Sequence, residues 1–551
     1  MNKKNESKLY WHRFIVITGL VFILIAGCTE PNHNENYYNG KQILSRDLQD
    51  IQTLELQKKE TEDAVAQEAN VPAPEKLEIT LEECRAMALE NNLDLKIQLI
   101  NPAIAAERIS QEEARFEAAF SANTSYTKTD TPVASTLDIS GSNIEYMSNN
   151  MGINMPLKTG GTVSINAVDN RSKTDSSYSI FNPSYSSDLS ASISQPLLRN
   201  AGNRASTYAI QIAKYNYQIS NAQTKLEAIR VITDIDKYYW RLYAARKELE
   251  VRRQWFDHAV ALQEQAQRLY EAGQVAQVEV IRSQAGVAQR REAIITSENN
   301  VKLRERDLKK ALNKTGMGMN SPTMLVEATE PDPVYYELKE DALINVALDE
   351  RMEMLELELQ IAQDVITQGY LENQALPLVT FDYTYNINGL GSSRNDSYEL
   401  LKDKRFEDHR FGLNLSVPLG NVAAKSQLQQ AFLQRRQRLS TKENREALIE
   451  YEVLNAIDQI EANWQRILAS RQSSILYNRL SEAEDRQFEL GYVTSTEVLE
   501  AQSNLADAQS SEISALVDYQ ISLVDLAYAT GTVFGSAKIR WEPLDMENDA
   551  K

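Results

Sequence analysis

Two glutamates near the end of this sequence have a type and spacing that could act on ions. Glu497 and Glu500 follow Gly491 by six and nine residues, and a spacing of three places both on one face of a helix. Glu279 lies six residues after Gly273, but Arg282 stands three residues further on. Such residues are most often a solvated helix face. Several copies drawn close together would instead repel one another and favour cations.

Other side chains that could do chemistry are few and scattered. The four histidines form no HxxxH motif and no Cys/His cluster, which argues against a metal site. The sequence has no GxxxxGKS/T motif for nucleotides, and no nucleophile or acid/base motif supports a hydrolase. Two cysteines, Cys28 and Cys84, make no disulfide framework, and we expect Cys84 to be a core residue. We therefore expect no enzyme activity and no cofactor.

The N-terminus predicts export and a lipid anchor. Basic residues precede the stretch FIVITGLVFILIAGC, whose apolar run is shorter than the roughly 20 residues of a membrane-spanning helix. We interpret residues 1–27 as a signal peptide. The end of this stretch resembles a bacterial lipobox, which implies that the Cys28 thiol is lipidated; an incidental cysteine is the alternative. The following Thr29 is not the aspartate that retains many lipoproteins at the inner membrane.

Composition narrows the class of protein. The chain has 551 residues and a net charge of −20, which argues against a nucleic-acid partner. Glycine and proline are scarce for this length, as is typical of long helices. Residues 28–76 read as a polar tether, and 536–551 as a polar tail.

A duplication organises the rest of the chain. RLYEAGQVAQVEVIRSQAGVAQ, from Arg268, matches RQFELGYVTSTEVLEAQSNLADAQ, from Arg486, at an offset of 218 residues. We expect a first repeat at 77–316, a link at 317–338 and a second repeat at 339–535. Changes in the offset place about 37 extra residues in the first repeat, where the pattern predicts an additional hairpin near 151–168. Four further residues are added within a long helix, which can absorb one extra turn.

Each repeat contains strands and long helices. LVTFDYTYNI and RFGLNLSVPLG alternate apolar and polar residues, as do half-buried strands of a soluble sheet or strands of a membrane barrel. The export signal favours the barrel. Proline-free stretches at about 201–270 and 424–490 would give helices of about 100 Å, longer than a globular domain needs. A structural coiled coil is the alternative, but it does not explain strands interrupting both copies at matching places.

Four stretches together carry a family resemblance over residues 79–535: SISQPLLRNAG, LNLSVPLGNVAAKSQLQQA, YEAGQVAQVEVIRSQ and FELGYVTSTEVLEAQ. The sequence resembles the TolC-like outer-membrane efflux factors, and here specifically an outer-membrane efflux lipoprotein. The resemblance implies an α+β membrane protein that forms a homotrimer. Long helical hairpins would build a periplasmic α-barrel, and each chain would give four strands to a shared twelve-stranded β-barrel in the outer membrane. The link would lie in an equatorial region.

The resemblance also implies a site and partners. Gly273 and Gly491 would be the periplasmic tip turns, and the acidic constriction positions would be Glu497 and Glu500, with Glu279 in the first copy. The chain would be a passive exit duct of a tripartite efflux or type I secretion system, anchored in outer-membrane lipid. It would dock a periplasmic adaptor (a membrane fusion protein) and an inner-membrane pump. The alternative is a periplasmic coiled-coil scaffold or adaptor without a pore.

Overall fold

The computed structural model describes residues 76–132, 142–176 and 178–541. The chain divides into two units, Met1–Ala73 and Pro74–Lys551, and every described residue belongs to the second. The predicted signal peptide, the predicted lipidation site at Cys28 and nearly all of the predicted tether lie outside the described residues. Everything below concerns the second unit alone.

Helices lead into the sheet and return from it in both copies of the repeat. In the first copy they are α3 (Leu81–Asn91), α4 (Leu93–Glu113), α6 (Tyr208–Glu271) and α7 (Gln277–Leu312). In the second they are α8 (Glu340–Glu350), α9 (Met352–Gln374), α11 (Val422–Glu489) and α12 (Ser495–Ala529). Short helical pieces are η3 (Ala114–Phe116), α5 (Asn203–Ser206), α10 (Arg394–Lys402) and α13 (Val533–Ser536).

The two longest helices run unbroken through the predicted proline-free stretches. Helix α6 has 64 residues and α11 has 68, so each extends about 100 Å at 1.5 Å per residue. The four extra residues of the first copy are contained within α6 without a break. None of the described helices is long and apolar enough to cross a bilayer.

Six antiparallel strands form one sheet, in the order β2-β3-β4-β5-β7-β8. They are β2 (Ala119–Asp130), β3 (Asn143–Pro156), β4 (Thr162–Thr174), β5 (Ser184–Pro196), β7 (Leu378–Gly391) and β8 (Glu407–Ser416). The expectation of four strands per chain is therefore wrong, because the sheet of this chain has six. The extra residues of the first repeat form β3 and β4, whose backbone groups pair within the sheet on both sides instead of folding away from it.

The sheet has one apolar and one polar face. Neighbouring strands bring Ala167 opposite Leu189, and Leu189 opposite Ile387, on the apolar face. On the other face Ser164 lies opposite Ser192, and their hydroxyls are 2.7 Å apart. Because side chains alternate along each strand, the in-register pairing extends both faces across all six strands.

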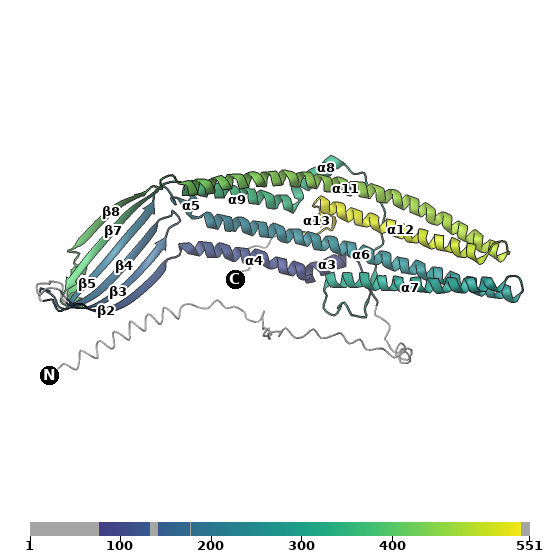
Figure 1. The fold of residues 1–551 in the computed structure, drawn as a ribbon, viewed down its shortest axis with the longest axis horizontal. Helices are drawn as coiled ribbons and strands as arrows, with labels where there is room; N and C mark the ends of the chain where they lie inside the picture. Colours follow the sequence, from purple (N-terminus) through teal and green to yellow (C-terminus); the bar gives the residue numbers. More distant parts are fainter. Residues whose placement is uncertain (1–75, 133–141, 177, 542–551) are drawn as a thin grey trace, which may run out of the picture. The chain divides into compact units, whose positions relative to one another are not determined.

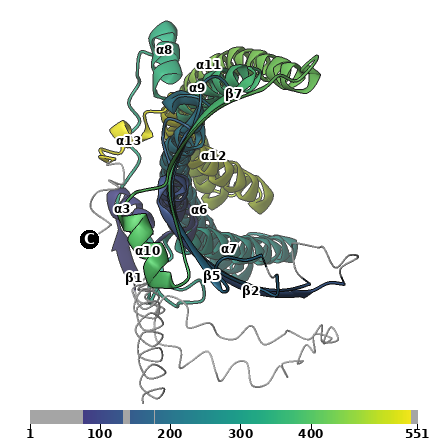
Figure 2. The same ribbon diagram turned by 90° about the vertical axis from the view of Figure 1, so that its left-hand side faces the viewer.

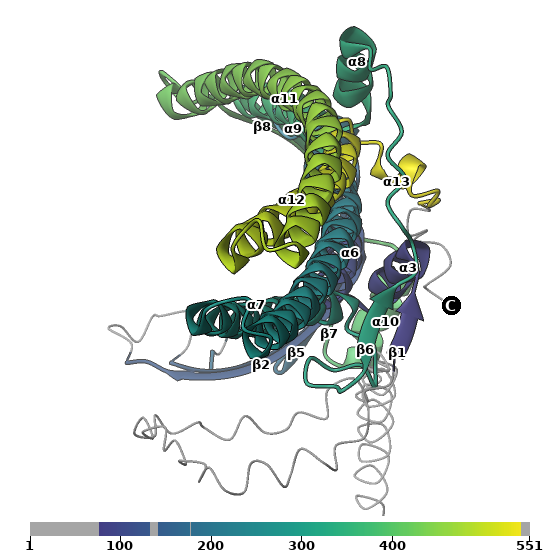
Figure 3. The same ribbon diagram turned by 90° about the vertical axis from the view of Figure 1, so that its right-hand side faces the viewer.

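The position of helix α10 shows which face of the curved sheet is convex and which is concave. A Cβ added to Gly389, which shares the apolar face with Ile387, would meet the backbone of Ser397 in α10 at 2.2 Å. This helix therefore packs on the apolar face. Figures 2 and 3 show α10 on the convex side of the curved sheet, so the apolar face is convex and the polar face concave.

The long helices continue from the sheet and pair as antiparallel hairpins. Helix α7 packs along α6, and α12 along α11, while α4 and α9 pack on the sheet-proximal parts of the same long helices. In Figure 1 the turns of both hairpins lie at the end opposite the strands. A parallel pair of short strands, β1 (Lys76–Ile79) and β6 (Met324–Glu327), joins the start of the first repeat to the link between the repeats.

Cores form where the helices meet near the middle of the unit. One cluster joins α3, α6 and α7 around Tyr239, Leu242 and Leu308, and another joins α8, α9, α11 and α12 around Val453 and Tyr519. Cys84 is buried in the first cluster, and burial raises the pKa of its thiol to about 12. It is a core residue, as predicted from the sequence.

Candidate functional site

Two matching turns, one in each repeat, join the long helices at their far end. The first turn lies between α6 and α7, and the second between α11 and α12. Gly273 and Gly491 occupy the turns with φ of +73° and +77°, a region that side chains with a Cβ rarely adopt. A Cβ would meet no atom within 4 Å at either position, so the backbone conformation alone requires glycine there.

The two turns are packed together by a small apolar cluster. Leu262 and Ala266 of α6 contact Phe488 of α11 and Val498 of α12, and all four side chains are buried. The cluster fixes the hairpin of one repeat against the hairpin of the other. The acidic residues predicted from the sequence lie immediately beside it.

Glu279 links the two hairpins instead of facing solvent alone. Its carboxylate accepts hydrogen bonds from the backbone N–H of Ser495 at 3.1 Å and from the Ser495 hydroxyl. Arg282 pairs with the same carboxylate at 2.7 Å. Because Ser495 begins α12, the glutamate also lies at the positive end of that helix dipole. Burial alone would raise the pKa of Glu279, but the Ser495 hydrogen bonds and the Arg282 charge together lower it.

Glu497 and Glu500 lie on the first turns of α12 and are both exposed. The Glu497 carboxylate accepts from the Thr494 N–H at 2.6 Å and from its hydroxyl at 3.0 Å, which makes a capping box at the start of the helix. The Glu279 carboxylate thus binds Ser495, and the Glu497 carboxylate binds the preceding residue, Thr494. Glu500 follows one turn further along α12.

Comparison with known proteins places the chain in a family. The profile of the family described as outer membrane efflux protein matches residues 162–314 and 343–532. The chain belongs to the outer membrane efflux protein family. This membership confirms the resemblance carried by the motifs, and the gap in the match contains the predicted link at 317–338.

Individual relatives agree with this assignment. The outer membrane protein TolC of Vibrio cholerae serotype O1 is 29% identical over 199 residues, which are 35% of this chain and 44% of the relative. The matched region therefore spans less than half the length of that protein.

Solved structures extend the likeness in fold. The Campylobacter jejuni CmeC outer membrane channel has a TM-score of 0.61 at 15% identity, covering 82% of this chain and 85% of that one. The Vibrio cholerae outer membrane protein VceC has a TM-score of 0.59 at 13% identity, covering 82% and 96%. At these identities the likeness shows a shared fold: this chain has the fold of the outer-membrane channels.

One charged residue of this efflux protein's hairpins was not found from the sequence. Arg290 of α7 is only 2% exposed, stacks on the Trp255 ring at 4.5 Å and donates to the Leu499 carbonyl of α12 at 3.2 Å. Burial lowers the pKa of its guanidinium to about 10. A signal was present: the equivalent position in the second repeat is Ala508, so the first copy carries a charge at a position where the second has a small apolar residue.

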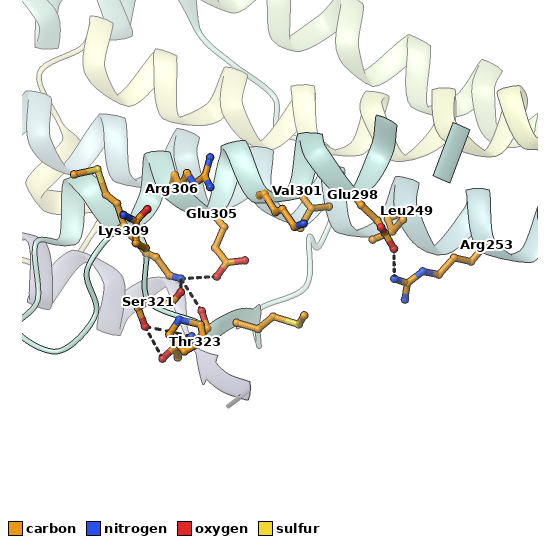
Figure 4. Close-up of a pocket in the computed structure, with 14 residues that line it drawn as sticks. Leu249, Arg253, Glu298, Val301, Glu305, Arg306, Lys309, Ser321 and Thr323 are labelled. Atoms are coloured by element: carbon orange, nitrogen blue, oxygen red, sulfur yellow. Dashed lines mark hydrogen bonds and ion pairs between the residues drawn. The ribbon is translucent and has the colours of Figure 1, made fainter. Parts of the chain in front are cut away.

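A pocket of about 490 Å³ lies beside the link, between α6, α7 and the segment that leads to β6 (Figure 4). Arg253 and Glu298 pair across the helices at 2.9 Å on one side of it. On the other side Lys309 donates to the carbonyls of Ser321 and Thr323. These contacts fasten the link onto α7, and we assign the pocket a structural role.

Replacing Glu279 with Ala should loosen the contact between the hairpins. Hydrogen bonds to a charged group contribute about 1.5–3 kcal/mol, so amide exchange at Ser495 should accelerate roughly 10- to 100-fold. Glu271→Ala removes an exposed glutamate from the end of α6 and serves as the matched control. Hydrogen exchange read by mass spectrometry measures both variants. Equal exchange of the 495–502 segment in the two variants would show that Glu279 does not hold α12.

This contact should also depend on pH in a defined direction. The folded pKa of Glu279 is lowered, so the contribution of its ionised form is complete above the ordinary carboxyl range. It is lost as the pH falls through the lowered folded value. Protection of Ser495 should therefore be constant near neutral pH and decline only in acid, and the Glu279→Ala protein should lack this decline.

Proposed function

We propose that three copies of this chain form a passive exit duct through the outer membrane and across the periplasm. The duct would serve a tripartite efflux or type I secretion system, docking a periplasmic adaptor and an inner-membrane pump that supplies the energy. The single observation that carries the proposal is the two-faced sheet at the end of helices about 100 Å long.

The faces of the sheet suit a barrel with lipid outside and water inside. The convex face carries Phe120, Ile153, Ile165, Phe381 and Leu413, one from each of five strands. The concave face carries mainly serine, threonine, asparagine and aspartate. This alternation, with an apolar band outward, is typical of outer-membrane strands. A soluble sheet would need a second layer over the convex face, and among the described elements only the short α10 covers part of it.

The helices suit a hollow tube. Two hairpins per chain and three chains would place six hairpin tips around one periplasmic opening. The exposed carboxylates of Glu497 and Glu500 would form acidic rings there, with Glu279 fastening neighbouring hairpins behind them. Cys28, as a lipidated N-terminus, would anchor the tether of each chain to the membrane.

Replacing Glu497 and Glu500 together with Ala should weaken the cation preference of the channel. Removing six carboxylates from a narrow opening removes most of its negative potential, so the potassium-to-chloride permeability ratio should fall severalfold. The exposed pair Glu443→Ala and Glu450→Ala on α11 removes the same charge away from the tip and is the control. Planar-bilayer recordings in a salt gradient give the ratio directly. A ratio that falls equally in both double variants would refute the rings, and the absence of any discrete channels would refute the duct.

A further inference from the structure

We infer that this chain builds an outer-membrane barrel of eighteen strands, half again as many as the twelve that the resemblance implies. The inference rests on the proposed trimeric duct and adds to it the width of its outer end. It follows from the six-stranded sheet, from the two edges of that sheet and from the number of helices that must join it.

The additional hairpin is an integral part of the sheet. Strand β3 pairs with β2 along Asn143–Asn154, and β4 pairs with β5 along Thr162–Ser172, both without interruption. Met151, Ile153 and Ile165 continue the apolar face across the hairpin. Because the hairpin occupies the middle of the strand order, no barrel can include β2 and β5 and leave it out.

Both edges of the sheet are open and suited to a second copy of this chain. The outer strands β2 and β8 have one partner each among the described strands, and nearly every residue of both is exposed. Open edges of this length present unpaired backbone groups that can pair with a strand of another chain. Because the sheet alternates direction over six strands, β8 of one copy runs antiparallel to β2 of the next. The exposed apolar residues Phe120 and Phe411 would then continue one lipid-facing band across the junction.

A barrel of this width is compatible with the helical tube. Helices α4, α6, α9 and α11 lie side by side at the sheet end, so three chains supply twelve helices there. At an interaxial distance of 8–10 Å their ring measures roughly 96–120 Å around. Eighteen strands spaced 4.8 Å apart and tilted by about 40° measure about 113 Å around, whereas twelve measure about 75 Å. Eighteen strands would therefore continue the tube at about equal width.

The distance between copies tests the inference. Thr384→Cys places one thiol on the concave face of β7, and the buried Cys84 remains shielded from a nitroxide reagent. In a trimeric barrel of eighteen strands the three β7 backbones should be about 31 Å apart, and in one of twelve strands about 21 Å. The labels point into the bore, so the distance between them should be shorter than the backbone distance, by the same amount in either barrel. Pulsed electron–electron resonance on the trimer in lipid measures this distance.

A deletion supplies the matched control. Excising residues 131–183 and inserting an Asn-Gly turn joins the distal ends of β2 and β5 and leaves four strands per chain. The label distance should then fall by about 10 Å, the difference between the two backbone distances. If the deleted chain does not assemble, the full-length label distance, corrected for the inward reach of the two nitroxides, is compared with the backbone distances of about 31 Å and 21 Å.

The outcomes separate this inference from the proposed duct. A label distance about 10 Å longer than that of the deletion variant, in a conducting trimer, supports eighteen strands. Equal label distances in the full-length protein and the deletion variant, in conducting trimers, overturn eighteen strands and leave the duct standing. Non-conducting protein without one defined distance overturns the duct, and the inference with it.

Discussion

Replacing Leu413 with Arg should prevent most of the protein from accumulating as a folded trimer in the outer membrane. Leu413 is 68% exposed in the single chain and lies on the convex apolar face of β8. An arginine on the lipid side of a barrel costs about 2–4 kcal/mol per chain near the middle of the bilayer, and a trimer carries three. Semi-native electrophoresis of outer-membrane fractions measures the surviving trimer.

The neighbouring residue provides a control of the same size and charge. Asn414 lies on the concave face of β8 and donates to the Asp382 carboxylate at 2.7 Å. An arginine there can pair with the same carboxylate in water, so Asn414→Arg should leave the trimer yield close to that of the unmodified protein. Equal yields from the two variants would show that the convex face does not lie in lipid.

Replacing Arg85 with Met should destabilise the core near the middle of the unit by about 3–5 kcal/mol. Arg85 of α3 makes two hydrogen bonds of 2.7 Å to the Asp236 carboxylate of α6, whose side chain is only 3% exposed. Removing the arginine leaves a buried carboxylate without its cation. The thermal unfolding midpoint, followed by circular dichroism, should fall by several degrees.

The protonation of Asp236 also determines how the loss of stability in Arg85→Met varies with pH. Burial raises the pKa of Asp236, and the Arg85 hydrogen bonds and charge lower it in part, so it should rise further in Arg85→Met. A carboxyl with a raised folded pKa stabilises the fold below its unfolded pKa, and this contribution is lost as the pH rises through the folded value. The variant's deficit should therefore shrink in acid. The exposed Arg268→Met is the control and should shift the midpoint little at any pH. A pH-independent deficit would contradict the role given to Asp236.

Repeats, alternation and turn residues in the sequence predicted the elements whose geometry is determined by residues close together in the chain. The shared offset of the repeats, the alternation in 378–387 and the glycine turns at Gly273 and Gly491 each record a backbone geometry in neighbouring residues. The hairpin near 151–168 was also visible, because alternation and a Gly-Gly turn suffice to indicate it. Its position in the sheet was not, since pairing between distant strands depends on register and not on local sequence.

The residues of the candidate site were predicted from the sequence, but the contacts between them were not. Glu279, Glu497 and Glu500 were identified from the repeat and the resemblance, but the contact between Glu279 and Ser495 joins residues far apart in the chain. Helical spacing describes one helix at a time and cannot show which side chain a neighbouring hairpin presents. Arg290 was missed for this reason, although comparison with Ala508 would have marked it as a charge at a position suited to an apolar residue.

Potassium release from lipid vesicles tests the central claim, a continuous water-filled bore enclosed by three chains. Purified protein is reconstituted into potassium-loaded vesicles, and protease protection confirms insertion, with Leu413→Arg protein as the uninserted control. We predict that vesicles carrying an inserted trimer release their potassium, and that the released fraction rises with the number of trimers per vesicle. Vesicles that hold inserted trimers and still retain their potassium would contradict the claim.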